Sequence, residues 1–274
     1  MSPLPEIRKT ALMWLAETNA VDKAVGVQAF GKTLSPGLND DELGCTIEPN
    51  IPLSTSLTIP GRPEKPELVS PLEVKKRSMR TLEGRAALLH ALAHIEFNAI
   101  NLALDAVWRF TDMPKSYYLD WFKVATEESH HFLLLNTHLA SLGFKYGDFT
   151  GHDSLWEMVD RTKGDVLARM ALVPRTMEAR GLDASPALRN KLAQAGDTKA
   201  AEILDIILAD EIGHVAIGNR WFNYLCEKDN LEPLSTYTRL CHTYAAPKLR
   251  GPFNLDARRK AGFSEAELLS LTQS

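Results

Sequence analysis

The chain reads TEESHHF at residues 126–132 and ADEIGHV at residues 209–215. Both stretches carry an acidic residue, then Glu-x-x-His, then an apolar residue. The equivalent Glu and His residues are Glu128, His131, Glu211 and His214. Residues three apart share one face of an α-helix, so each Glu and its His can converge on one ion.

Four segments with helical apolar spacing contain this pattern. The first is marked by apolar residues from Leu88 to Val107 and ends near Asp112-Met113-Pro114. The others cover about residues 116–141, 154–180 and 199–228. Long helices in this number predict an all-α fold built on a four-helix bundle.

The ends of these helices also follow from the sequence. Gly143 and Gly181 come directly after the second and third helical segments and predict their ends. Pro174 predicts a kink or bulge inside the third segment. A polar connection over residues 183–197 is expected before the fourth. No strand pair with a convincing turn occurs between residues 74 and 228.

Two further glutamates complete the repeated pattern. Glu96 lies 32 residues before Glu128, and Glu178 lies 33 residues before Glu211. Each falls in a helical segment of its own, so a duplicated helix pair would leave this trace. We therefore predict a metal site formed by Glu96, Glu128, His131, Glu178, Glu211 and His214.

Charge balance indicates how many ions such a site would hold. Four carboxylates pointing into one bundle core are very costly without compensation. Two divalent cations would balance four ionised glutamates, and two neutral imidazoles would complete the coordination. An oxygen-rich site with one imidazole per ion suits iron or manganese better than a closed structural zinc. Iron is favoured, with manganese as the alternative.

The pattern is more specific than a single match. A chain of this composition should contain roughly half of one Glu-x-x-His match by chance, and it contains three. The third match is Glu127 with His130, and the ligand register could shift to that pair. Alignment with the fourth helical segment favours Glu128 and His131. His90 and His94, four apart on the first segment, are interpreted as hydrogen-bonded packing residues.

Composition sets broader limits. The chain has 274 residues, of which 45% are hydrophobic and 24% are charged. This length allows one large domain or two small ones, and the composition excludes wholesale disorder. A formal net charge of −4 leaves no global basic field for nonspecific binding of nucleic acid.

The sequence also indicates a cellular location. It contains no run of about 18 apolar residues, so no membrane span is expected. The first residues, MSPLPEIRKTALMWLAETN, lack a small-residue cleavage site and do not read as a signal peptide. Three cysteines without a CxxC pair are typical of a reduced chain. We expect a cytoplasmic protein.

Three regions are expected along the chain. Residues 1–75 hold eight of the 15 prolines, so we predict a short helix within about residues 5–30 and an extended arm packed on the bundle. A detached, flexible linker is the alternative. Residues 76–228 form the four-helix bundle. Residues 229–274 form a tail with one or two short helices around Gly251-Pro252.

These motifs resemble a known superfamily. The ferritin-like di-metal carboxylate proteins have this pattern: two helices each supply one Glu, and two other helices each supply Glu-x-x-His. More narrowly, the chain resembles the ferritin-like group called domain of unknown function 455. The stretches that carry the likeness are LHALAHIE (89–96), EESHHF (127–132), PRTMEAR (174–180), ADEIGH (209–214), PGRP (60–63) and RGPFN (250–254). The likeness covers nearly the whole chain.

The resemblance implies the bundle and the two metal ions, but it does not fix the reaction. Members of the superfamily include oxygen-activating oxidases and hydroxylases, iron stores, manganese catalases and a tRNA hydroxylase. We interpret the chain as a di-iron oxidoreductase or hydroxylase, because its arm and tail exceed what a storage shell needs. No catalytic residue is assigned beyond the metal ligands.

Alternative functions remain open at this stage. The chain could be a non-catalytic metal store or a metal-stabilised scaffold, or it could act on peroxide without an organic substrate. The expected partners are dioxygen or peroxide and a small substrate or electron donor, for a monomer or dimer without a membrane. A tRNA substrate is disfavoured by the acidic charge. Basic residues could gather into an anion-binding patch, although isolated surface charges are the simpler interpretation: Arg62, Arg175, Arg180, Arg250, Arg258, Arg259 and Lys260.

Overall fold

The computed structural model describes residues 4–34, 44–75 and 77–273, so residues 35–43 of the predicted arm lie outside the described part. The secondary structure is helical, and the described residues contain only two isolated β-bridges and no strand. The prediction of an all-α protein is confirmed. The chain divides into two compact units, Met1–Asp153 and Ser154–Ser274.

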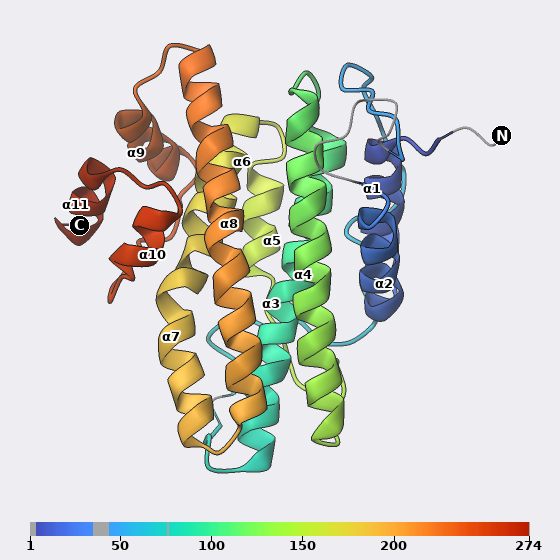
Figure 1. Cartoon of the computed structure of the whole chain (residues 1–274), viewed down its shortest axis with the longest axis vertical. Helices are drawn as coiled ribbons and strands as arrows, with labels where there is room; N and C mark the ends of the chain where they lie inside the picture. Colours follow the sequence, from blue (N-terminus) through green and yellow to red (C-terminus); the bar gives the residue numbers. More distant parts are fainter. Residues whose placement is uncertain (1–3, 35–43, 76, 274) are drawn as a thin grey trace. The chain divides into compact units, whose positions relative to one another are not determined.

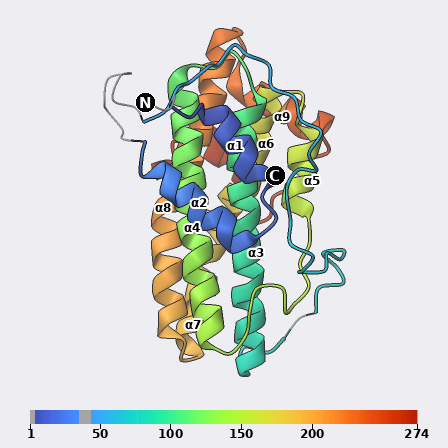
Figure 2. The same ribbon diagram turned by 90° about the vertical axis from the view of Figure 1, so that its right-hand side faces the viewer.

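The first unit is built on two long antiparallel helices, α3 (Leu82–Arg109) and α4 (Lys115–Ser141). They run side by side in both views (Figures 1 and 2). Thr81 caps α3 by accepting a hydrogen bond from the Gly84 amide at 3.0 Å. Gly143, with φ of 85°, ends α4 as predicted.

Two shorter helices cross this pair in Figure 2, α1 (Ile7–Ala16) against α3 and α2 (Ala20–Gly31) against α4. The sequence predicted one short helix here. It is divided because the Asn19 side chain accepts hydrogen bonds from the amides of Val21 and Asp22 and starts a new helix.

The described part of the arm lies against these helices. Arg8, which is buried in α1, donates hydrogen bonds to the carbonyls of Glu48 and Ile51 in the arm and of Trp108 in α3. The Gly61 amide donates to the Leu15 carbonyl at 2.8 Å. A Cβ atom on Gly61 would lie 2.1 Å from the Ala16 carbonyl oxygen, so this close approach requires glycine.

The second unit is built on the long helix α8 (Thr198–Lys228) and the chain that precedes it. That chain forms α5 (Ser154–Arg161), α6 (Val166–Leu172), the π-helix η2 (Val173–Glu178) and α7 (Ala179–Gln194). The predicted bulge at Pro174 is confirmed as η2. The predicted stop at Gly181 and the predicted polar connection are wrong, because α7 passes Gly181 and continues to Gln194.

Three short helices follow α8, where the sequence predicted one or two. They are α9 (Pro233–Thr243), α10 (Leu255–Lys260) and α11 (Glu265–Gln273). Asn219 of α8 donates a hydrogen bond to the Ala261 carbonyl at 2.7 Å and ties the end of α10 to the long helix.

Helix α3 has the length and composition of a membrane-crossing helix, with a mean hydropathy of 1.3 over its most apolar window. The sequence predicts no membrane span, because it contains no unbroken run of about 18 apolar residues. However, 78% of that window is buried inside the protein, as in the core helix of a soluble protein.

Candidate metal centre

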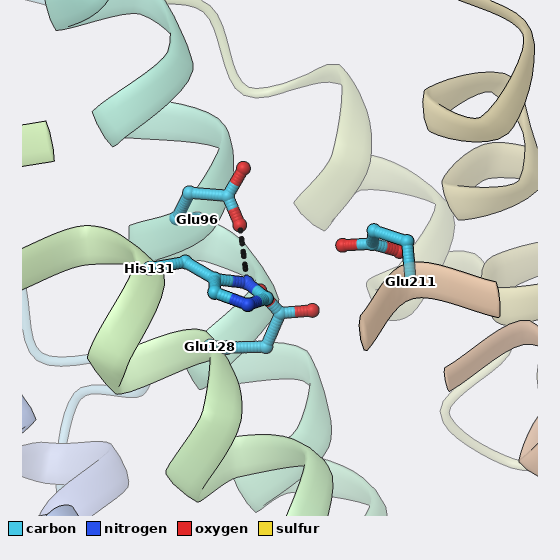
Figure 3. Close-up of side chains that lie close together, drawn as sticks. All are labelled: Glu96, Glu128, His131 and Glu211. Carbon is cyan, nitrogen blue, oxygen red and sulfur yellow. Dashed lines mark hydrogen bonds and ion pairs between the residues drawn. The ribbon is translucent and has the colours of Figure 1, made fainter. Parts of the chain in front are cut away.

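Three potential ligands converge inside the first unit. Glu96 comes from the middle of α3, and Glu128 and His131 come from successive turns of α4. One ligand atom from each of them lies within 4.8 Å of the other two. His131 Nδ1 is 3.2 Å from Glu128 Oε2 and 3.4 Å from Glu96 Oε2 (Figure 3). We call these three residues the Glu96 cluster.

The Glu96 cluster is buried among apolar side chains. Glu128 and His131 have no exposed surface, and Glu96 is 4% exposed. The neighbours of these ligands in sequence, Phe97 and Phe132, pack with their ring centroids 5.9 Å apart. Two acidic groups in such a place are unfavourable without a compensating positive charge.

This environment perturbs the Glu96 carboxyl. Burial raises the pKa of Glu96 well above its usual range, and the nearby Glu128 carboxylate raises it further. The His131 side chain opposes this shift. Glu96 therefore tends to keep its proton in the protein alone, and a bound cation would favour the ionised form.

The geometry of the Glu96 cluster fits a metal ion. Two ligand atoms about 2.1 Å from one ion and at right angles to each other lie about 3 Å apart. The two distances from His131 Nδ1 are close to this value. One imidazole with carboxylates is a donor set suited to iron or manganese.

The second unit carries the other three predicted ligands. Glu211 and His214 lie on successive turns of α8, with His214 Nδ1 3.7 Å from Glu211 Oε1. This repeats the arrangement of Glu128 and His131 on α4. Glu178 is the last residue of η2 and is 8% exposed. Assignment of all six residues as ligands of one centre stays a prediction.

The neighbouring candidates have other environments. His130 is exposed, unlike His131. Glu127 forms an ion pair with Lys123 at 2.9 Å on the surface of α4. The structure therefore favours the register of Glu128 and His131 for a buried site in α4.

His90 and His94 are packing histidines, as the sequence indicated. His90 Nε2 accepts a hydrogen bond from the Gly147 amide at 3.0 Å. His94 Nδ1 lies 2.8 Å from the Tyr146 hydroxyl. Sequence reasoning missed Tyr146, whose ring packs on both Phe97 and Phe132 beside the ligands. It lies in the loop after α4, and helical periodicity does not predict the position of a loop residue.

Four of the basic residues singled out in the sequence are paired with acids. Arg62 forms two hydrogen bonds to Asp153, and Arg258 forms two to Asp183. Arg175 pairs with Glu267, and Arg259 pairs with Glu265 and Asp256. Each acid neutralises the positive charge of its arginine, and RNA binding depends on uncompensated positive charge at the protein surface. These four arginines therefore give no support to a broad basic patch.

The chain is thus an all-α protein with a buried Glu/His cluster that could hold a metal ion. Residues 17–269 match the family described as "Protein of unknown function (DUF455)", and the chain belongs to this family. An "Uncharacterized protein" of Haemophilus influenzae (strain ATCC 51907 / DSM 11121 / KW20 / Rd) is 54% identical over 213 residues, covering 75% of this chain and 74% of that protein. No solved structure matches the chain.

Proposed function

We propose that the protein is a di-metal carboxylate protein with a ferritin-like four-helix bundle, and that it acts as an oxygen-activating oxidoreductase. The four bundle helices would be α3, α4, the α6–η2–α7 segment and α8. Each unit would contribute one Glu from its first helix and Glu-x-x-His from its second.

The Glu96 cluster carries this proposal. It is a buried set of two carboxylates and one imidazole whose donor atoms face one another at ligand-to-ligand distances. A purely structural role is a weak explanation, because two buried carboxylates in contact destabilise a core unless a cation or a proton compensates them. The matching Glu211 and His214 on α8 support a second ion of the same kind.

Iron is the proposed metal, with manganese as the alternative, because the donor set is rich in oxygen and contains no thiolate. Two bound ferrous ions would supply electrons for the reduction of dioxygen. The protein's own groups would then have defined tasks. Glu96 would release its proton when an ion binds. Glu128 and His131 would be held in place by their spacing on α4, and Phe97 and Phe132 would exclude water.

Anaerobic loading with ferrous iron followed by exposure to oxygen tests the proposal. We expect two iron ions per chain by elemental analysis, and prompt conversion of both to the ferric state by Mössbauer and absorption spectroscopy. His131→Ala should lower the iron content by at least about one ion per chain, because it removes a nitrogen ligand.

His130→Ala is the matched control, since it changes the adjacent but exposed histidine, and its iron content should equal that of the wild type. Iron that binds at two per chain but remains ferrous in oxygen would replace the oxidoreductase with a non-catalytic metal-binding scaffold. Equal iron content in wild type and His131→Ala would contradict the metal site itself.

A further inference from the structure

The second unit contains a cavity of about 250 Å³ that lies outside the metal ligand set. Its wall comes from η2, α9, α10, α11 and the chain between α9 and α10. The polar and aromatic residues that matter for recognition are Arg175, Tyr237, Lys248, Arg258, Phe263 and Glu267. This volume is slightly below the usual range for small-molecule sites, which is about 300–1,000 Å³, so the cavity suits a small ligand.

Arg175 is the main polar group of this wall. It is 3% exposed, and its Nε donates a hydrogen bond to Asn219 Oδ1 at 2.7 Å. Its Nη2 forms an ion pair with Glu267 of α11. Its buried Nη1 has no hydrogen-bond partner among the described residues. A buried guanidinium N–H without an acceptor is costly, so its persistence points to a ligand that supplies one.

Aromatic rings hold Arg175 in this position. The guanidinium carbon lies 4.4 Å from the ring centroid of Phe222 and 4.9 Å from that of Tyr237. A third ring, Phe263, lies at 5.1 Å. Rings at these distances stabilise a cation and restrict its rotation. The donor therefore does not depend on the ligand for its placement.

The charges of the wall favour an anion. Arg258 is compensated by two hydrogen bonds to Asp183, which is not part of the wall. Glu267, the only acidic residue of the wall, compensates Arg175. The positive charge of the exposed Lys248 therefore has no match among the wall residues.

The rest of the wall is mainly apolar. Leu234, Leu249 and Leu271 line it together with Phe263 and the ring of Tyr237. An anion with an apolar body would place its charged group at the cationic part of such a wall and its body against these side chains. A fully hydrated inorganic anion would leave this apolar surface uncovered.

We propose that this cavity binds a small organic carboxylate, with its carboxylate on Arg175 and Lys248 and its apolar body against the leucine and aromatic side chains. The Nη1 of Arg175 can donate a charge-assisted hydrogen bond to one oxygen of the ligand carboxylate, and the Lys248 ammonium can pair with the same group. The contact with Glu267 already shows Arg175 paired with a carboxylate. This site involves no proposed metal ligand, so its test is independent of the test of the proposed function.

Calorimetric titration of the metal-free full chain tests this site. The probes are benzoate and hexanoate, and the uncharged amides benzamide and hexanamide are their matched controls. We expect the carboxylates to bind with dissociation constants of about 1 mM or below, and the amides at least about tenfold more weakly, because an amide lacks the charge.

Two variants place the binding in this cavity. Lys248→Gln changes an exposed residue and should weaken carboxylate binding several-fold without affecting folding. Arg175→Lys keeps the charge but removes the Nη1 donor, and should weaken binding at least about tenfold. Arg189→Lys, an exposed arginine outside the wall, is the control and should bind as the wild type does.

Absence of heat from both carboxylates up to 10 mM (about ten times the expected constant) would overturn the proposal. Equal binding of the acids and the amides would also overturn it. So would carboxylate binding that is unchanged both in Lys248→Gln and in a folded Arg175→Lys variant. These results would leave the iron-loading experiment unaffected, because that experiment depends on a different set of residues.

Discussion

At the residue scale, His90 shows how burial fixes a protonation state. Its side chain has no exposed surface, and its Nε2 accepts a hydrogen bond from the Gly147 amide at 3.0 Å. An acceptor nitrogen carries no proton, so the imidazole is neutral. Burial, and to a smaller extent the neighbouring His94, lowers the pKa of His90 to about 4.

This pKa predicts acid destabilisation. The unfolded chain takes up a proton at His90 near its ordinary pKa of 6.5, and the folded chain does so only near 4. The contribution of His90 to stability is therefore complete above pH 6.5 and decreases as the pH falls to 4, by roughly 3 kcal/mol in total. Urea unfolding of the metal-free protein at several pH values measures this loss.

The matched variant is His90→Gln, whose side-chain oxygen can accept the same hydrogen bond but cannot be protonated. It should lose less stability than the wild type between pH 6.5 and 4. Two identical pH profiles would show that His90 is not held neutral in the folded chain.

At the scale of the secondary-structure element, η2 follows from one proline. In a continuous α-helix, the ring of Pro174 would clash with the carbonyl four residues earlier and would leave it without an N–H partner. A π-turn relieves this conflict. The Ala179 amide donates to the Pro174 carbonyl five residues back, and the Thr176 hydroxyl donates to the Ala171 carbonyl at 2.8 Å.

The bulge requires a small residue on the facing helix. A Cβ atom on Gly218 of α8 would lie 2.6 Å from Cβ and 2.7 Å from Cγ of Pro174, whose ring cannot rotate away. Gly218→Ala should therefore lower the free energy of unfolding by about 1–2 kcal/mol, because overpacking exceeds the gain in helix propensity. Chemical denaturation of the metal-free protein measures the change.

Gly213 on the same helix gives the control, since a Cβ atom there meets nothing within 4 Å. Gly213→Ala should raise stability by about 0.5–1 kcal/mol. Opposite signs for two Gly→Ala changes on one helix would identify the contact with Pro174. Equal signs would contradict it.

Helix α7 shows why one boundary could not be predicted. Gly181 and Pro186 are both signals that end a helix in sequence. The helix continues because a distant residue supplies the hydrogen bond that Pro186 cannot: Asn254 Nδ2 donates to the Leu182 carbonyl at 3.2 Å. The backbone N–H of Asn254 also donates to Asp183 Oδ1 at 2.9 Å. Contacts between residues 72 apart are not visible in a local pattern.

This explanation predicts an energetic coupling. Asn254→Ala should lower the free energy of unfolding by about 1–2 kcal/mol, since it leaves the Leu182 carbonyl without its donor. The cost should be smaller by about 0.5–1 kcal/mol in a Pro186→Ala background, because the new amide at residue 186 can donate to Leu182 instead. Urea unfolding of the four proteins of this cycle measures the coupling.

Asn254 also caps α10 through the Ala257 amide, but that contribution is present in both backgrounds and cancels in the cycle. Additive costs would mean that Asn254 does not compensate for Pro186.

The sequence was most informative where local periodicity decides the structure. The bounds of α4 and α8 and the bulge at Pro174 all follow from apolar spacing, helix-stop glycines and proline chemistry. The Glu96 cluster follows from helix geometry in α4, and its carboxylate from α3 was found only because the pattern repeats. The cavity beside Arg175 depends on how α9, α10 and α11 fold back, which no local signal specifies.

At the scale of the whole molecule, the two units carry equivalent ligand sets. The first has Glu96 followed by Glu128 and His131, and the second has Glu178 followed by Glu211 and His214. Each set offers two carboxylates and one imidazole, which leaves open positions on a six-coordinate iron ion. Under the proposed function the two sets would share carboxylates and act as one centre.

This requirement predicts that ligand changes in different units are not additive. Glu128→Ala in the first unit and His214→Ala in the second should each remove most of both iron ions and lower the melting temperature of the iron-loaded protein, because the metal stabilises only the folded form. The double variant should lose little more than either single one. Elemental analysis and thermal unfolding of the four iron-loaded proteins measure both effects. If each single variant instead lost one ion and the double variant lost two, the sets would be separate sites, and the di-metal centre would have to be abandoned.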